Sequence, residues 1–266
     1  MNDRVTIDIQ DGVADVRLVR TDKMNALDDA MFSALIEAGE RLKTEAGLRA
    51  VVLSGEGRAF CAGLDMGNFG KMASGERKGG SGLVDTDRTA GGSNRAQHAV
   101  MVWREIPVPV IAAVHGVAFG GGFQLALGAD IRIVAPDTRM AVLEIKWGLV
   151  PDMAGIALLR GLVRDDQARE LTFTGRIFSG EEAASLGIAT RVSADPHADA
   201  MAMAREIAAK NPDAIRAGKR LLDLMADSDQ KAILLEESRE QAALIGSPNQ
   251  VEAVMASMQK REAVFR

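Results

Sequence analysis

The sequence predicts an α/β fold made of repeated strand–strand–helix units and followed by a helical C-terminal segment. Three observations predict it. The first fifty residues read as strand, strand, helix and strand, and a second series of strands and short helices occupies 96–187. Beyond Pro196 no strand signal appears, and the chain reads as helices only.

The N-terminal unit carries the strongest local patterns. Apolar residues alternate through 5–18 on both sides of Asp11-Gly12, a pair that is typical of a two-residue hairpin turn. Apolar residues then recur at helical spacing through 28–43, and a buried strand follows at 49–53.

The regular pattern stops at 67–94, which is rich in Gly, Ser and charge and is too long for an ordinary connection. It is either a functional loop or a surface insertion. Beyond it the sequence predicts a helix at 96–104, a buried strand at 108–114, a Gly-dense turn at 116–122, a short helix at 123–128, strands at 131–134 and 140–142, and a short helix from 179.

The C-terminal region is predicted to be four helices with apolar stripes, at 198–210, 212–226, 229–245 and 249–264. We therefore divide the chain into a core with the active site, residues 1–197, and a helical oligomerisation segment, residues 198–266. So much apolar helix surface indicates docking onto another subunit.

Composition excludes several classes of function. The chain has 266 residues, 32 Lys+Arg, 37 Asp+Glu and a net charge of −5, so nucleic acid is not an expected partner. No apolar run reaches the roughly 18 residues of a membrane span. A single cysteine, Cys61, excludes internal disulfides and fits a reducing compartment, so we expect a cytoplasmic protein. The 27 glycines beside 4% aromatics and no Tyr are unusual.

Several common site signatures are missing from the sequence. There is no P-loop, no G-x-S-x-G elbow and no H-E-x-x-H, and the glycines at 120–122 do not complete a dinucleotide-binding fingerprint. The histidines His98, His115 and His197 lack ligand-like spacing, so we expect no metal.

Two loops and one acid carry the positive signals. Residues 57–66 and 116–122 are small-residue loops that each follow a buried strand, at the sheet edge where α/β folds bind ligands. Facing one another, such loops offer two backbone N–H groups to a developing oxyanion. Tight packing of helix on sheet is the alternative use of their glycines. Glu144 follows an apolar strand beside Trp147, where desolvation raises a carboxyl pKa; a solvated or ion-paired Glu is the alternative.

These residues, in this order, resemble the crotonase superfamily, the enoyl-CoA hydratase/isomerase family. The resemblance covers nearly the whole chain, and it rests on the order and spacing of segments that are each weak alone: Arg20 with 25–27, 57–65, 109–122, 129–131, 148–151, 171–175 and 184–187.

The resemblance implies a crotonase-like spiral of strand–strand–helix turns, a homotrimer or dimer of trimers, and an acyl-CoA substrate. Coenzyme A belongs to that substrate, so no separate cofactor is expected. The resemblance maps the oxyanion hole onto the N–H groups of Leu64 and Gly121. It maps the site of the CoA arm onto Lys23, Met24, Ala62, Asp65 and Met66, with Lys260 reaching a phosphate from a neighbouring subunit.

The catalytic centre departs from the usual hydratase pattern, in which two glutamates position and split a water. Glu144 matches the second, but the first falls on Gln124, which cannot act as a base. Dienoyl-CoA isomerases place aspartates at the positions of Gln124 and Asp152, and only Asp152 is present here. Gln124 could hold a water for Glu144 or Asp152, whereas double-bond migration needs Glu144 alone.

The prediction is therefore an acyl-CoA enzyme of the hydratase/isomerase type that stabilises a thioester enolate, with one glutamate as acid and base. The alternatives are a Δ3,Δ2-enoyl-CoA or dienoyl-CoA isomerase without hydratase activity, and an acyl-CoA binder without catalysis. A serine protease of related architecture would need a serine in one of the two loops, and neither loop has one.

Overall fold

The computed structural model describes residues 3–67, 86–225 and 228–266. A six-stranded sheet forms its centre, in the order β1-β2-β3-β4-β6-β8, and the only antiparallel pair is the N-terminal hairpin β1–β2. Asp11 and Gly12 make the hairpin turn with φ of 51° and 77°, which confirms the predicted turn. The strands are Val5–Gln10 (β1), Val13–Leu18 (β2), Ala50–Gly55 (β3), Val110–Val114 (β4), Ile131–Val134 (β6) and Arg191–Val192 (β8).

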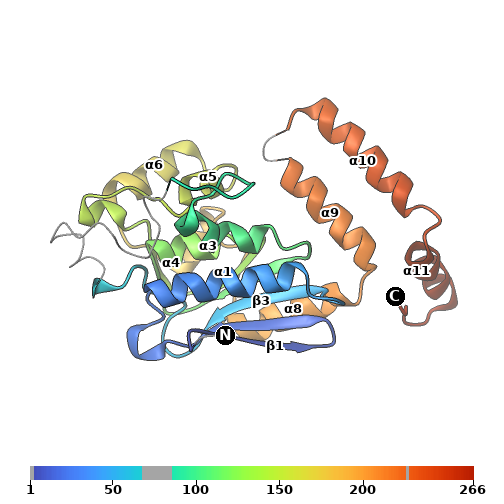
Figure 1. Ribbon diagram of the computed structural model, residues 1–266, viewed down its shortest axis with the longest axis horizontal. Helices are drawn as coiled ribbons and strands as arrows, with labels where there is room; N and C mark the ends of the chain where they lie inside the picture. The colour runs from blue at the N-terminus through green and yellow to red at the C-terminus, as the bar shows by residue number, and fades with distance from the viewer. Residues whose placement is uncertain (1–2, 68–85, 226–227) are drawn as a thin grey trace.

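Side chains of the parallel strands alternate between two cores, as the strand period of two requires. Val51 and Leu53 of β3 join the larger core, together with Phe32, Trp103 and Phe123 from the helices that cover that face. The neighbours Ala50 and Val52 face a smaller core, which α8 (Pro196–Ala208) closes with its small residues. Figure 1 shows α1 and α8 in separate layers around the sheet.

The larger core is covered by α1 (Asp29–Lys43), α3 (Arg95–Arg104) and α4 (Gly121–Leu127). Asp28 caps α1 by accepting a hydrogen bond from the Met31 N–H. Asn94 and Gln97 form a capping box that starts α3. These caps begin each helix within a residue of where the apolar pattern predicts it.

The structure also has a second, two-stranded sheet and several short helices. This sheet pairs β5 (Val117–Phe119) with β7 (Arg139–Ala141) in parallel. The short helices are η1 (Thr21–Lys23), η2 (Glu144–Trp147), α5 (Gly155–Leu159), α6 (Asp165–Thr174) and α7 (Gly180–Ser185).

The last three helices, α9 (Pro212–Leu224), α10 (Gln230–Leu244) and α11 (Pro248–Gln259), extend away from the sheet (Figure 1). Buried Lys219 of α9 anchors them, since its ammonium donates to Asp130 Oδ2 over 2.7 Å and to the Val108 carbonyl over 3.0 Å. We call α9, α10 and α11 the C-terminal arm. Its exposed apolar residues include Leu222, Met225, Leu234, Leu235, Ile245, Met255 and Met258. No helix of the described residues is long and apolar enough to cross a bilayer.

Candidate active site

A pocket opens where the two small-residue loops meet the segment that follows β7. Its lining is mostly apolar and includes two carboxylates. Six of the residues predicted from the sequence line it, namely Ala62, Leu64, Met66, Gly121, Glu144 and Asp152; the other lining residues are Gly63, Phe119, Gly120, Leu143, Trp147, Leu149 and Met153. Gln124 is buried and bonds Glu144, while Lys23, Met24, Asp65 and Lys260 lie outside the described lining.

Backbone contacts hold the two loops against each other. The Phe119 N–H donates to the Cys61 carbonyl over 3.2 Å, and the Cys61 N–H donates to the Val117 carbonyl over 3.0 Å. A Cβ on Gly122 would lie 2.2 Å from the Cys61 oxygen, so no larger residue allows this approach. Close packing, one of the two uses that the sequence left open for these glycines, therefore occurs here.

The N–H group of Leu64 points away from Leu27 because of how its neighbours pair. Gly63 O accepts from the Leu27 N–H over 2.8 Å, and the Asp65 N–H donates to Leu27 O over 3.0 Å. In a parallel bridge of this kind, the residue between the two bonded neighbours is Leu64, and its own N–H and C=O groups point away from Leu27. Within the described part of the chain the Leu64 N–H has no acceptor.

Gly121 has a second N–H group without an acceptor among the described residues. It is the first residue of α4, where helix geometry leaves the N–H without an intrahelical acceptor, and the described residues supply no other. A Cβ on Gly63 would lie 3.7 Å from the Gly121 nitrogen, which shows how close the two loops run here. A Cβ on Gly121 itself would overlap Leu27 and Met153.

Glu144 begins η2 directly after the second sheet, and 8% of it is exposed. Its Oε1 accepts a 2.6 Å hydrogen bond from Gln124 Nε2, and its Oε2 is buried without a partner among the described residues. Burial raises the pKa of Glu144, and hydrogen bonding by its own backbone N–H and then by Gln124 offsets part of that rise. The ion pair considered as the alternative is not formed, since Lys146 and Arg139 lie over the rings of Trp147 and Phe119.

Gln124 projects from α4 and is 1% exposed. Its Oε1 accepts hydrogen bonds from the N–H groups of Met153 and Gly155, each over 2.9 Å. The sequence contains no local signal for these contacts, because they join a side chain to backbone groups about thirty residues away.

Asp152 lines the same pocket, on the segment between η2 and α5. Burial and then the negative charge of Glu144 raise its pKa to about 6. The pocket therefore holds two acids that both bind a proton more tightly than carboxyls in water do.

The segment predicted to bind the CoA arm is held by one arginine and one asparagine. Arg20 donates to Asp65 Oδ2 over 2.7 Å and to the Ala26 carbonyl over 3.0 Å. Asn25, with φ of 56°, donates to the carbonyls of Glu56 and Ala59. The Ala62 N–H donates to Met24 O, so the expected CoA segments are joined by backbone.

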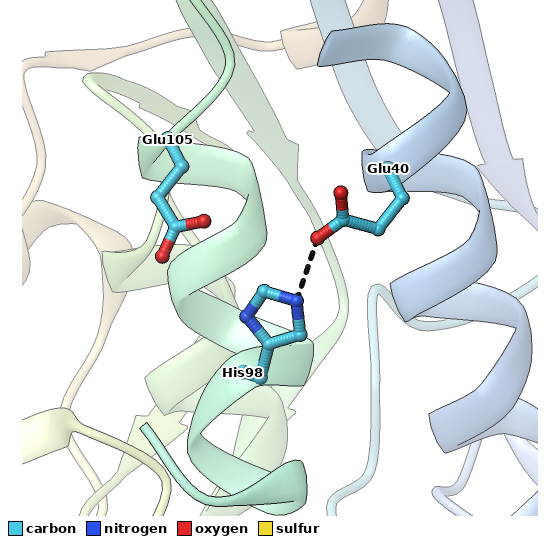
Figure 2. A group of neighbouring side chains, drawn as sticks. All are labelled: Glu40, His98 and Glu105. Carbon is cyan, nitrogen blue, oxygen red and sulfur yellow. Dashed lines mark hydrogen bonds and ion pairs between the residues drawn. The ribbon is translucent and has the colours of Figure 1, made fainter. Parts of the chain in front are cut away.

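Two further groups have structural explanations. Burial raises the pKa of Cys61 to about 12, so its thiol stays protonated and donates to the Asn25 carbonyl. Glu40, His98 and Glu105 form the one set of metal-ligand type among the described residues, on the facing sides of α1 and α3 (Figure 2). The ammonium of Lys43 contacts both carboxylates of this set, so each of them is already paired with a positive charge. Most of the loop expected at 67–94 lies outside the described residues.

Comparisons with known proteins identify the family of the chain. A sequence profile described as enoyl-CoA hydratase/isomerase matches residues 8–266. A probable enoyl-CoA hydratase of Bacillus subtilis is 31% identical over 91% of each chain. The human mitochondrial Delta(3,5)-Delta(2,4)-dienoyl-CoA isomerase is 31% identical over 95% of this chain and 78% of its own.

The fold is shared as well. A crystal structure of a putative enoyl-CoA hydratase/isomerase from Mycobacterium abscessus superposes with a TM-score of 0.89 at 28% identity, covering 98% of this chain and 99% of that one. The chain therefore belongs to the enoyl-CoA hydratase/isomerase family, a crotonase-fold enzyme family, as its sequence motifs predict.

Proposed function

We propose that the protein binds an acyl-CoA thioester with the carbonyl oxygen between the N–H groups of Leu64 and Gly121. Both groups line the pocket and lack acceptors in the described chain. Negative charge that develops on the thioester oxygen as an enolate forms gains most from such donors, because they are fixed before the reaction begins. Each such donor typically contributes about 3 kcal/mol to the transition state.

Glu144 is the acid and base of this proposal. Glu144 and the two amide loops line one pocket, and Oε2 of Glu144 has no partner among the described residues; this is the observation that carries the assignment. The carboxylate removes a proton from C2 or C4 of an enoyl thioester, which leaves a conjugated enolate. The resulting carboxylic acid returns the proton to the other carbon, so that one double bond moves and no atom is gained or lost.

The second candidate activity of this site is the hydration of a 2-enoyl thioester. Water oxygen bonds to C3 while Glu144 takes its proton, and C2 of the enolate then receives a proton. Asp152 is the only other acid that lines the described pocket. Its raised pKa keeps this carboxyl protonated below about pH 6. The protonated form is the one that can deliver a proton to C2.

The test is to assay the purified protein with trans-2-enoyl-CoA and 3-enoyl-CoA thioesters, for hydration and for double-bond migration. Glu144→Gln should lower whichever activity is present by at least 100-fold. Glu206→Gln, at an exposed position of α8, is the matched control and should keep full activity. Full activity of Glu144→Gln would rule the mechanism out. Tight acyl-CoA binding without either reaction, and without exchange of the C2 proton in heavy water, would identify a non-catalytic binder.

We further infer that the chain assembles through its C-terminal arm as a homotrimer or a dimer of trimers. The arm carries many exposed apolar side chains, more than an isolated surface normally leaves in water. Lys23, Met24, Ala62, Asp65 and Met66 would follow the CoA arm, with Lys260 supplied by a neighbouring subunit. Light scattering at several protein concentrations tests the assembly, and a monomer throughout would contradict it.

A further inference from the structure

We propose that Gln124 is a positioning residue that fixes one carboxylate oxygen of Glu144, so that only Oε2 exchanges protons with the substrate. The proposal rests on the function proposed above for Glu144. It assigns Gln124 a role other than holding a water or transferring a proton.

The orientation of the Gln124 amide is determined by its surroundings. Its Oε1 receives two N–H groups, from Met153 and Gly155, which use both lone pairs of the amide oxygen. A flipped amide would turn its NH₂ group toward two donors. The NH₂ group is therefore the end that faces Glu144, and its 2.6 Å bond to Oε1 is a donated one.

A water beside Gln124 would find no acceptor on this side chain, because Oε1 is saturated. Gln124 is therefore unable to accept a proton or a hydrogen bond from a nucleophilic water. What it does instead is hold Glu144 Oε1, while Oε2 remains buried without a partner among the described residues.

Close packing keeps both side chains in this arrangement. A Cβ on Gly155 would lie 2.7 Å from both Cγ and Oε1 of Gln124, and a Cβ on Gly120 would lie 3.2 Å from Glu144 Oε1. Both side chains are buried, Gln124 at 1% and Glu144 at 8% exposure. The carboxylate therefore has little room to rotate and presents one fixed oxygen.

Two variants separate this role from simple support of the 152–155 segment. Gln124→Met keeps the length of the side chain but loses the donor to Glu144 and the acceptor for the two N–H groups. Gln124→Glu keeps the acceptor and replaces the donor with a second carboxylate oxygen that faces Glu144. Gln10→Glu, at an exposed position of β1 outside the pocket lining, makes the same charge change and is the control; its amide also donates to a carboxylate, that of Asp8.

We expect both Gln124 variants to raise the pKa of Glu144, because one removes a donor to the carboxylate and the other adds a neighbouring negative charge. The rate kcat should fall at least tenfold, with KM changed less than threefold, since the acyl-CoA contacts are kept. The pKa is measured from the pH dependence of kcat and, without substrate, from the carboxyl ¹³C resonance of Glu144. Gln10→Glu should match the wild-type protein in each measurement.

An unchanged Glu144 titration and kcat in folded Gln124→Glu would overturn the proposal, even if Gln124→Met is unstable. Failure of the proposed function has a different signature. In that case Glu144→Gln stays active, while the ¹³C titration still reports whether Gln124 controls the carboxylate.

Discussion

A methyl group on Gly63 would lie 2.5 Å from the carbonyl oxygen of Phe119, which lies in the second amide loop two residues before Gly121. Gly63 also has φ of +87°, a region that L-residues rarely adopt. The two amide loops can therefore approach each other this closely only because Gly63 has no side chain.

We predict that Gly63→Ala moves the two loops apart and lowers kcat/KM by about 100-fold, because displacement of a donor by an ångström has effects of that order. Gly47→Ala is the matched control. Gly47 has φ of +74° with no atom within 4 Å, so it shares the backbone strain without the overlap.

Both variants should lose about 1 kcal/mol of unfolding free energy from strain, and Gly63→Ala more. Urea unfolding and steady-state kinetics measure the two effects. Equal activities of the two variants would show that spacing of the loops does not limit catalysis.

Asp152 makes folding stability depend on pH. Its pKa of about 6 in the folded protein lies above the ordinary value of 3.8. The folded state therefore binds this proton more tightly than the unfolded chain does. The stability from Asp152 is complete below pH 3.8 and is lost as pH rises through about 6.

We expect Asp152→Asn to remove that loss, which amounts to about 1–2 kcal/mol after allowance for the partial exposure of the carboxyl. Relative to the wild-type protein, the variant should thus gain stability between pH 4 and pH 7. Urea titrations at several pH values measure the difference, with exposed Asp137→Asn as the control. A constant difference across that range would contradict the pKa assignment.

The fold follows from sequence patterns where those patterns are local. Asp11-Gly12 specifies the hairpin turn. The two amide loops meet because one follows β3 and the other follows β4, and these two strands are parallel neighbours in the sheet. The contact of Gln124 with the Met153 and Gly155 backbone is different in kind. It depends on how a buried side chain meets a distant irregular segment, and no periodicity encodes that. Sequence reasoning therefore found Glu144 and Gln124 but not the bond between them.

Lys219 is predicted to hold the C-terminal arm to the core. It is 7% exposed and bonds Asp130, which also accepts from the Val110 N–H. Lys219→Met keeps the aliphatic stem but leaves Asp130 without its cation, so we expect a loss of about 3 kcal/mol. Urea unfolding measures the loss, and faster amide exchange in α9 should accompany it.

Lys210→Ala is the control, since its 3.8 Å pair with Glu206 is exposed and should contribute less than about 0.5 kcal/mol. Equal stabilities of the two variants would mean that the arm is held by its apolar contacts.

Lys260 should act on the pocket of another subunit. It follows α11, which lies at the opposite end of the molecule from α4 and α5 (Figure 1). If its ammonium binds a CoA phosphate in trans, Lys260→Ala should raise KM about fivefold and leave kcat unchanged, because an exposed charge pair contributes about 1 kcal/mol. Added salt should narrow the difference, and Lys210→Ala should show none.

Mixed oligomers distinguish action in trans from action within one chain. Glu144→Gln subunits lack the base but keep Lys260, whereas Lys260→Ala subunits keep the base. After the two variants are unfolded and refolded together, a fraction of the working sites receives Lys260 from an inactive neighbour. That fraction should regain the wild-type KM, and two-component kinetics should reveal it. A single high KM in the mixture would show that Lys260 does not act across the subunit interface.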